Sequence, residues 1–328
     1  DDAGGFHAQM QRHGQCVHTT ALVDINEVQA NGFGPCVLSY GGDTFNTSVY
    51  LRRCASPNAI EVSYATGLGV DPLSQQLKLA WKDLGLNLNA IQSIDGKLPG
   101  MYLIETDDKG ERSFHFWREN SAARAYFQAP ETDLEKNAHN YDCIYFSGIS
   151  LAILDDASRK RLFSVLQKAR ALGCRVVFDN NFRPKLWPSL QVAQQIYLEA
   201  FNVCHTAMLT LDDHQAVFGH ANLDDALRHA QAFDVPEMVI KRGADSTLVR
   251  ENPDASWQSI TTERVEHVLD TTAAGDSFAA GYLSRRLLGE SAFLSAEFGN
   301  KVAARVIQHR GALIPLDAMQ DLISPLAN

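Results

Sequence analysis

The chain is poor in the features that are typical of secreted, metal-binding and membrane-spanning proteins. Its 328 residues include only six cysteines, and none of them forms a C-x-x-C pair, so a disulfide scaffold or a cysteine zinc site is not expected. The eleven histidines show neither H-x-x-x-H nor H-E-x-x-H spacing, which argues against a metal ion held by the protein alone. No apolar run is long enough to cross a bilayer.

An excess of positive charge is also missing. The formal net charge is −10 and the pI ≈ 5.5, which argues against bulk affinity for nucleic acid or an anionic membrane. An anionic substrate would therefore need a local cluster of Arg or Lys. Because there is no G-x-x-x-x-G-K-[ST] loop and no G-x-G-x-x-G after a first strand, a P-loop NTPase and a standard dinucleotide-dependent dehydrogenase are both disfavoured.

The first fourteen residues differ from the rest of the chain. Residues 1–14 are polar and lack the apolar core of a signal peptide, so we expect a disordered tail or tag remnant there and one folded unit over 15–328. Cys143, Cys174 and Cys204 lie in apolar, strand-like runs. Buried thiols of this kind are typical of a protein in the reducing cytoplasm.

From about residue 140 onward, strand-like segments alternate with helix-like segments. Such alternation predicts an α/β fold with a doubly wound, mostly parallel sheet and helices on both faces. Ligands of such sheets bind beyond the carboxyl ends of the strands. The expected strands are 143–146, 175–178, 203–209 and 238–240, and the expected helices are 155–172, 188–201, 212–218, 222–233, 276–288 and 291–309.

A second, smaller sheet is expected from about 33–40 and 92–120. Strand-like residues at 103–104 and 114–117 flank Asp107-Asp108-Lys109-Gly110, a sequence typical of a tight turn. Such a sheet can act as a lid over a site, as a dimer clasp, or as both.

The stretch from Asp270 to Phe278 is the most informative in the chain. It follows a β-like run at 265–269 and opens a helical pattern. Small residues at such a turn let an anion approach the first free N–H groups of the helix. Asp276 in the first turn then suits a base that takes a proton from a hydroxyl, with its carboxylate kept ionised near neutral pH by the helix N-terminus. The alternative is a capping Asp.

A second polar stretch runs from Gly41 to Asn46 and precedes a helical pattern that continues to about Cys54. Two glycines allow close backbone approach. Asp43 and Asn46 are one turn apart, so they can face the same vicinal hydroxyls. The alternative for Asp43 is again an N-cap.

Three further side chains can recognise an anionic or keto-bearing substrate. Arg183 follows a buried strand at the expected ligand end of the sheet, where its guanidinium can form forked hydrogen bonds. Arg118 and Tyr102 lie on the two strands of the expected small sheet. The alternatives are a surface ion pair for Arg183, solvation for Arg118 and cross-strand packing for Tyr102. The stretch from Lys241 to Ser246 ends a strand, and it can pass beneath nucleotide phosphates or form an ordinary β-turn.

The stretch 270–281 resembles the C-terminal signature of the ribokinase-like (PfkB-type) carbohydrate kinases, and the stretch 41–46 resembles their N-terminal substrate motif. The resemblance covers about residues 15–320 and implies the ribokinase-like fold. It also implies a base at Asp276 and an anion hole at Ala273, Ala274 and Gly275. By the same resemblance the sugar-acid pocket comprises Gly41, Gly42, Asp43, Asn46, Tyr102, Arg118 and Arg183. The nucleotide side comprises Asn181, Lys241, Gly243, Ala244, Asp245, Ser246 and Asn300.

Within that family, segments 98–106, 110–118, 147–154 and 179–184 are most similar to the branch that acts on 2-keto-3-deoxygluconate. The resemblance implies phosphorylation of its terminal hydroxyl with ATP and Mg²⁺, and a homodimer or higher homo-oligomer joined through the lid sheet. The alternatives are another sugar kinase, such as a fructokinase, and a non-catalytic sugar sensor on a kinase fold. Two cationic arginines favour a sugar acid over a neutral hexose.

Three positions depart from the family pattern. Thr19-Thr20 stand where the first strand usually ends in Gly-Glu or Gly-Asp, with Asp24 at a later acidic position. The family's Asn-x-x-Glu motif reads Thr210-Leu211-Asp212-Asp213 here. Asp213 keeps a carboxylate that can act on Mg²⁺ through water. Phe116 stands where some relatives have a Tyr.

Overall fold

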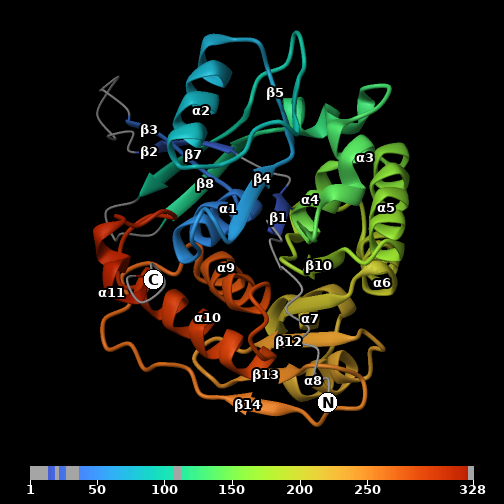
Figure 1. Cartoon of the computed structure of the whole chain (residues 1–328), viewed down its shortest axis with the longest axis vertical. Coiled ribbons are helices and arrows are strands. Elements are labelled where there is room, and N and C mark those ends of the chain that lie inside the picture. Colours follow the sequence, from blue (N-terminus) through green and yellow to red (C-terminus); the bar gives the residue numbers. More distant parts are fainter. Residues whose placement is uncertain (1–13, 19–21, 27–36, 107–111, 324–328) are drawn as a thin grey trace, which may run out of the picture.

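A computed structural model describes residues 14–18, 22–26, 37–106 and 112–323, and Figure 1 shows their arrangement. Its central sheet has eight strands in the order β14-β13-β12-β11-β10-β9-β1-β4. The strands from β12 to β4 run parallel, and β13 and β14 add an antiparallel edge. The doubly wound, mostly parallel sheet predicted from the sequence is therefore confirmed. Its strands are β1 Gly14–His18, β4 Ile60–Tyr64, β9 Cys143–Ser147, β10 Arg175–Asp179, β11 Thr206–Thr210, β12 Glu237–Lys241, β13 Thr247–Arg250 and β14 Gln258–Ile260.

Helices cover both faces of this sheet. In Figure 1, α9 and α10 lie on the opposite side of the strands from α5 and α6, and the buried apolar side chains form one cluster on each side. One face carries α1 Asp43–Cys54, α2 Pro72–Asp83, α9 Ala274–Arg286 and α10 Ala292–Val306. The other carries α3 Asp133–Asn137, α4 Gly148–Ile153, α5 Asp156–Ala171, α6 Leu190–Val203, α7 Leu211–Phe218 and α8 Leu223–Gln231, and a short α11, Gln320–Ile323, follows near the end.

Burial and capping explain why these segments form these elements. Every residue of β9 and of β12 is buried, as expected for parallel strands covered on both faces. Side chains cap the N-termini of three helices: Asp155, Ser189 and Ser291 each accept a backbone N–H from the first turn of α5, α6 and α10, respectively. None of the helices within the described ranges is long and apolar enough to cross a bilayer.

Close packing of α9 against α10 holds the helix that carries Asp276. A Cβ on Gly281 would lie 3.0 Å from the Cα of Gly299, and a Cβ on Gly299 would lie 2.9 Å from the carbonyl oxygen of Phe278. Only glycine permits such an approach of two backbones. The helix α9 is therefore held firmly against α10.

A separate four-stranded sheet has the order β3-β2-β7-β8. Strands β7 and β8 pair antiparallel, as the sequence predicted, while the turn expected at 107–110 lies outside the described residues. Because β3 leads through Gly42 directly into α1, this sheet stands next to the first turn of α1. The strands are β2 Leu22–Asn26, β3 Val37–Gly41, β7 Gly100–Thr106 and β8 Arg112–Trp117; a further pair joins β5 Thr66–Leu68 to β6 Ile91–Ser93.

Two local expectations from the sequence are wrong. The run Val265–Leu269 is not a strand: Val268 and Leu269 are at least half exposed, and the N–H of Leu269 bonds instead to the carbonyl of Ile307. None of the described strands pairs with this run. The first strand begins at Gly14, inside the expected tail 1–14; residues 1–13 and Thr19-Thr20 lie outside the described residues.

Candidate active site

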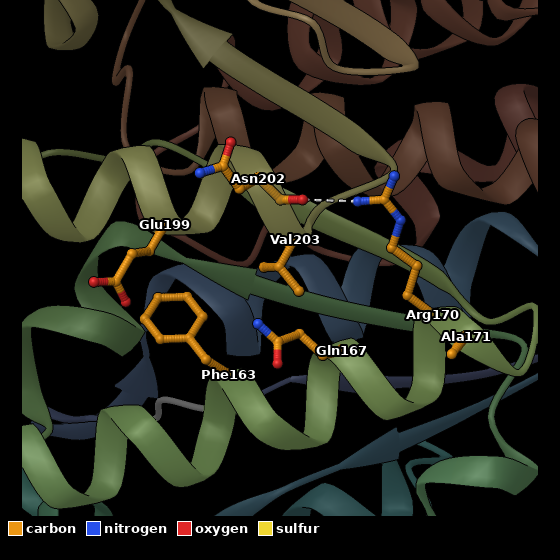
Figure 2. A pocket seen from close by; sticks show the side chains of 7 residues that line it. All are labelled: Phe163, Gln167, Arg170, Ala171, Glu199, Asn202 and Val203. Atoms are coloured by element: carbon orange, nitrogen blue, oxygen red, sulfur yellow. Dashed lines mark hydrogen bonds between the residues drawn. The ribbon is translucent and has the colours of Figure 1, made fainter.

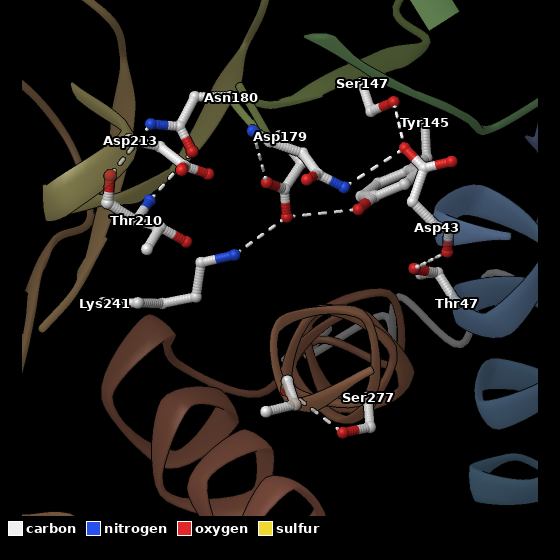
Figure 3. A network of polar contacts seen from close by, with 12 residues as sticks. Asp43, Thr47, Tyr145, Ser147, Asp179, Asn180, Thr210, Asp213, Lys241 and Ser277 are labelled. Atoms are coloured by element: carbon white, nitrogen blue, oxygen red, sulfur yellow. Dashed lines mark hydrogen bonds and ion pairs between the residues drawn. The ribbon is translucent and has the colours of Figure 1, made fainter. Parts of the chain in front are cut away.

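Four neighbouring parallel strands end side by side in polar residues. Asp179 of β10 stands in register with Ser147 of β9, and Lys241 of β12 stands in register with Thr210 of β11. Figure 3 shows these ends facing the N-terminus of α1, with α9 beneath them. This is the edge at which doubly wound sheets bind their ligands, so the candidate site lies here.

The N-terminus of α9 provides an anion-binding turn at this edge. Ala273 takes a left-handed conformation, φ 61°, and supplies no side-chain cap. The first N–H groups of a helix have no intrahelical acceptor, and the helix dipole favours an anion beside them. A Cβ built on Gly275 would lie 3.5 Å from Nζ of Lys241. The structure thus brings Ala273, Ala274 and Gly275 together with a lysine.

Asp276 lies in the first turn of α9 and contacts α1. Its Oδ2 accepts a hydrogen bond of 2.8 Å from Nδ2 of Asn46, and it is not the cap of α9, because Ala273 holds that position. Burial and the charge of Asp43 raise the pKa of Asp276 to about 8, against the lowering effects of Asn46 and Lys241. The expectation that the helix N-terminus keeps this carboxylate ionised near neutral pH is therefore wrong.

Asp43 does not cap α1 either. The N-cap is Gly42, with φ 146°. The Oδ2 of Asp43 accepts hydrogen bonds from Oγ of Ser147 and, at 3.2 Å, from Nδ2 of Asn181. Asp43 thus faces the strand ends, and its carboxylate joins α1 to β9 and the loop after β10. Asn46, one turn later, is 4 % exposed, and its Oδ1 has no hydrogen-bond partner among the described residues.

A buried ion pair joins the ends of β10 and β12. Nζ of Lys241 is 2.9 Å from Oδ2 of Asp179, and the same oxygen accepts 3.2 Å from the Tyr145 hydroxyl. Oδ1 of Asp179 accepts the N–H of Asn181, which has φ 21°. The sequence interpretation missed Asp179, Ser147 and Tyr145 as site residues. The first two end their strands, so the rule that ligands bind at carboxyl ends could have identified them.

The two predicted arginines come from different elements, Arg183 from the loop after β10 and Arg118 from the end of β8. Arg183 follows β10, and its Nη1 lies 3.8 Å from Oδ2 of Asp213, with half of its side chain exposed. The predicted alternative, an ion pair with a nearby acid, is thus observed. Asp213 also accepts the N–H of Phe182 at 3.1 Å. Burial raises the pKa of Asp213, although Arg183 opposes the shift.

Arg118 is half-buried, not solvated, and its Cζ lies 4.1 Å from the centre of the Phe116 ring. Burial lowers its pKa, the charge of Asp43 opposes that, and Arg124 and Arg183 lower it further. The charges of Asp43, Arg124 and Arg183 thus all act on the Arg118 guanidinium. Arg124 was missed, because nothing in its local sequence distinguishes it from a surface arginine.

Tyr102 packs across the small sheet and also borders the glycine pair. Its ring centre lies 5.7 Å from that of Phe116, its partner in register. Its hydroxyl lies 3.5 Å from the position of a Cβ on Gly41. The Tyr102 side chain therefore both packs across the strands and lies beside the glycine pair Gly41 and Gly42.

The expected nucleotide residues are more scattered. Residues 243–245 are exposed in a turn after β12, where the Asp245 N–H bonds to the carbonyl of Arg242 and Gly243 has φ 63°. This has the form of the predicted alternative, a β-turn, and Arg242 anchors Ser246. Asn300 in α10 is buried and accepts the hydroxyl of Thr247 at 3.0 Å.

A separate hollow of about 570 Å³ lies between the C-terminal ends of α5 and α6 (Figure 2). These helix ends precede β10 and β11, so the hollow is at the amino edge of the sheet, opposite the candidate site. Arg170 closes part of it by donating to the carbonyl of Asn202 at 2.9 Å. It contains none of the predicted site residues. Its lining comprises Phe163, Gln167, Arg170, Ala171, Glu199, Asn202 and Val203.

A carboxyl group beside an anion-binding turn and a lysine suits phosphoryl transfer to a hydroxyl, in which positioning and charge stabilisation dominate. The fold and the site together thus define a small-molecule kinase. More particularly, the chain belongs to the pfkB family of carbohydrate kinases, whose model matches residues 18–319.

Individual relatives are similar over most of the chain. A 2-dehydro-3-deoxygluconokinase of Dickeya dadantii is 47% identical over 283 residues, 85% of this chain and 91% of the relative. One of Haemophilus influenzae is 38% identical over 299 residues, 91% of this chain and 95% of the relative. Among solved structures, a fructokinase of Xylella fastidiosa with bound ATP has a TM-score of 0.78 at 19% identity, covering 97% of this chain and 100% of the other. That last likeness shows the fold alone.

Proposed function

We propose that this protein transfers the γ-phosphoryl group of ATP to the terminal hydroxyl of 2-keto-3-deoxygluconate, also called 2-dehydro-3-deoxygluconate. The product is 2-keto-3-deoxy-6-phosphogluconate. Relatives named for this activity are 38% and 47% identical over 85% or more of the chain. The structural observation that carries the proposal is Arg118, whose guanidinium is close enough to feel the charges of both Asp43 and Arg183, because a neutral sugar needs no such cations.

In this proposal Asp276 is the base. Its ionised carboxylate accepts the proton of the terminal hydroxyl while the hydroxyl oxygen bonds to the γ-phosphorus. The bond from that phosphorus to the bridging oxygen breaks, and ADP leaves with the electron pair. The N–H groups of the turn at Ala273, Ala274 and Gly275, with Lys241 beside them, stabilise the negative charge on the phosphoryl oxygens.

The sugar acid lies, we propose, between α1 and the small sheet. Asp43 and Asn46 bind its hydroxyls, since Asp accepts and Asn both donates and accepts. Oδ1 of Asn46 is buried without a partner among the described residues, so it is available to a hydroxyl donor. Arg118 and Arg183 bind the carboxylate and keto oxygens. The remaining contacts are assigned to Gly41, Gly42 and Tyr102, under a lid made by the small sheet.

The nucleotide side is assigned to Lys241, Asn181, Asp213, the turn 243–246 and Asn300. One half-buried carboxylate, Asp213, at the strand edge fits a Mg²⁺ ion, which keeps most of its waters and takes one or two carboxylates. Bound Mg²⁺ would neutralise charge on the phosphate oxygens. Asp213 meanwhile orients the loop after β10 by accepting the N–H of Phe182.

The same proposal extends to assembly and location. Three consecutive exposed residues end β8, an edge strand of the small sheet, namely His115, Phe116 and Trp117. We propose that this sheet joins two copies into a homodimer. A cytoplasmic location fits the thiols of Cys54, Cys174 and Cys204, all buried and outside any disulfide.

A coupled assay of ADP release tests the function. The purified protein is given ATP and Mg²⁺ with 2-keto-3-deoxygluconate and, in parallel, with fructose. We expect turnover on the sugar acid and little on fructose. Turnover on fructose alone would overturn the substrate and keep Asp276 as base. Binding of either sugar without turnover would identify a sensor instead of an enzyme.

A further inference from the structure

Three histidines form a cluster outside the candidate active site. His214 belongs to α7, His229 belongs to α8, and His220 lies in the connection between these helices. One ring nitrogen of each lies within 4.8 Å of the others. Nε2 of His214 is 3.0 Å from Nδ1 of His229. The packing of α7 against α8 therefore brings together three nitrogen donors that no short sequence motif predicted.

Two ring nitrogens in the cluster are unsatisfied. Nδ1 of His214 and Nε2 of His220 are buried and have no hydrogen-bond partner among the described residues. His214 as a whole is fully buried. A buried polar atom without a partner costs about 1–3 kcal/mol. His214 and His220, which carry these two atoms, are therefore poorly suited to plain core packing.

Aromatic rings surround the imidazoles. The centre of the Phe218 ring is 4.8 Å from that of His214 and 4.7 Å from that of His229, and Phe233 lies 5.0 Å from His229. This wall holds the imidazole rings in place and keeps water from one side. His220 and His229 are partly exposed, so the other side of the cluster opens toward solvent. Such an arrangement offers an ion two closely spaced donors, on His214 and His229, a third on His220 and an open position.

We propose that His214, His220 and His229 bind one divalent transition-metal ion of the Zn²⁺ type, with water in the fourth position. Three imidazoles and a water are a common zinc ligand set, and with Zn–N distances near 2.0–2.1 Å neighbouring nitrogens stand roughly 3.3 Å apart. The His214 and His229 nitrogens are already close to that separation, and the His220 ring needs to move inward. Mg²⁺ prefers oxygen ligands, so this ion is distinct from any that accompanies a nucleotide.

A bound ion would join α7 to α8. The same α7 carries Asp213 in its first turn, and Asp213 accepts the N–H of Phe182 next to Arg183. The ion would thus hold α7 at His214, directly after Asp213, in the helix whose N-terminus borders the candidate active site. The expected effect is on stability, whether or not the protein is turning over substrate.

Cobalt titration of the chelator-stripped full chain tests the site. At pH 7.5 the wild type should bind one Co²⁺ per chain with the intense visible absorption of a tetrahedral ion. Zn²⁺ should displace the Co²⁺. Zn²⁺ should also raise Tm, because it binds the folded state. The His229→Gln variant should bind at least about tenfold more weakly. Loss of a group that only supports a metal ligand already lowers the affinity about 10–100-fold. The His220→Gln variant should do the same, and it replaces His229→Gln should that variant not fold.

His139→Gln is the matched control, because His139 is an exposed histidine in the chain far from α7 and α8. It should bind as the wild type does. The proposal is overturned if wild type, His220→Gln and His229→Gln bind Co²⁺ equally, or if the bound ion shows only the weak absorption of octahedral, hydrated cobalt. Loss of the site in His139→Gln as well would also overturn it.

Discussion

At the scale of single residues, Asp276 shows how a fold sets the proton affinity of a base. The helix N-terminus favours the charged carboxylate, but burial and the nearby charge of Asp43 outweigh it and raise the pKa to about 8. The hydrogen bond from Asn46 and the charge of Lys241 act in the opposite direction. A base whose pKa lies near the working pH both exists in its charged form and binds a proton well.

Replacing this base tests its role directly. Asp276→Asn should lower kcat by at least about 10²-fold, the scale of general base catalysis. Its amide oxygen can still accept from Asn46, and it no longer repels Asp43, so Tm should not fall. Steady-state kinetics and thermal unfolding measure both, with Asp212→Asn as a control because Asp212 is exposed on α7. Near-normal kcat in Asp276→Asn would remove Asp276 from the mechanism.

The pH profile is a second test at this scale. Because the carboxylate must be deprotonated to act, kcat/KM should rise with pH and level off above about 8. Below that pH it should fall about tenfold per unit, since kcat/KM reports the ionisation of the free enzyme. The assay needs coupling enzymes in excess at every pH. A plateau that extends down to pH 6 would show that the carboxylate is ionised there.

The arginines determine the substrate class. Arg118→Leu should lower kcat/KM for the sugar acid about tenfold to about 100-fold, because a hydrogen bond to a charged group is worth about 1.5–3 kcal/mol and each 1.36 kcal/mol is a factor of about ten. Arg183→Leu should do the same, and any activity on fructose should change little. Arg264→Leu, at an exposed position, is the control. Equal losses on both sugars would mean a structural role for the arginines.

At the scale of elements, the small sheet links recognition to assembly. Strand β3 runs into α1 through Gly42, so the strand and the first turn that carries Asp43 are one continuous piece. At the other edge, β8 exposes Phe116 and Trp117, with 46% and 56% of their surface accessible. Exposed apolar edge strands are prone to pairing with another chain. The sheet is thus suited to be a lid and a dimer contact at once.

Substitution in β8 tests that contact. Trp117→Lys should shift the protein from dimer to monomer, because it places a charge in the proposed interface. Light scattering after size-exclusion chromatography measures the mass. Leu288→Lys, at an equally exposed apolar position after α9, should leave the dimer intact. A monomeric wild type, or a Trp117→Lys variant that stays dimeric, would contradict the proposed interface.

At the scale of the whole molecule, Glu237 anchors the edge of the sheet opposite the site. It is fully buried at the start of β12. Its Oε1 lies 3.1 Å from Nη1 of Arg175 and accepts 2.9 Å from the Tyr282 hydroxyl, and its Oε2 accepts 2.8 Å from Nε of Arg286. One carboxylate thus joins β10, β12 and α9. Burial raises its pKa, but the charges of Arg175 and Arg286 outweigh this, and the net pKa is lowered.

Glu237→Gln should lower the free energy of unfolding by about 3–5 kcal/mol, because it leaves two guanidinium groups without their buried counter-charge. Denaturant titration measures it, with exposed Glu199→Gln as control. Since the folded pKa is depressed, this stabilisation is complete above the ordinary glutamate pKa of about 4.3 and is lost as pH falls below it. A loss under about 1 kcal/mol would refute the anchoring role.

The sequence predicted most where local pattern and chemistry coincide. The helical pattern expected to continue to about Cys54 ends at that residue, and the alternation after residue 140 is the observed one. Asp276, Asn46 and Asp43 were grouped by motif, and the structure brings all three together. These successes arise from periodicity and turn chemistry, which neighbouring residues determine.

The errors and omissions have a common cause. The run 265–269 has the composition of a strand, but the N–H of Leu269 bonds to the carbonyl of Ile307 at the end of α10, and no described strand pairs with the run. The ionisation of Asp276 depends on Asp43, 233 positions away, and the ion pair of Asp179 with Lys241 spans 62 positions. The three histidines come together only when α7 packs on α8.

The sequence by itself determined the order of helices and strands, the anion-binding turn and the residue types suited to phosphoryl transfer, because these depend on contacts within a few residues. Only the tertiary structure decided which carboxylates meet, how strongly each holds its proton and which cations lie beside them. Charge interactions act through space, and folding sets those distances.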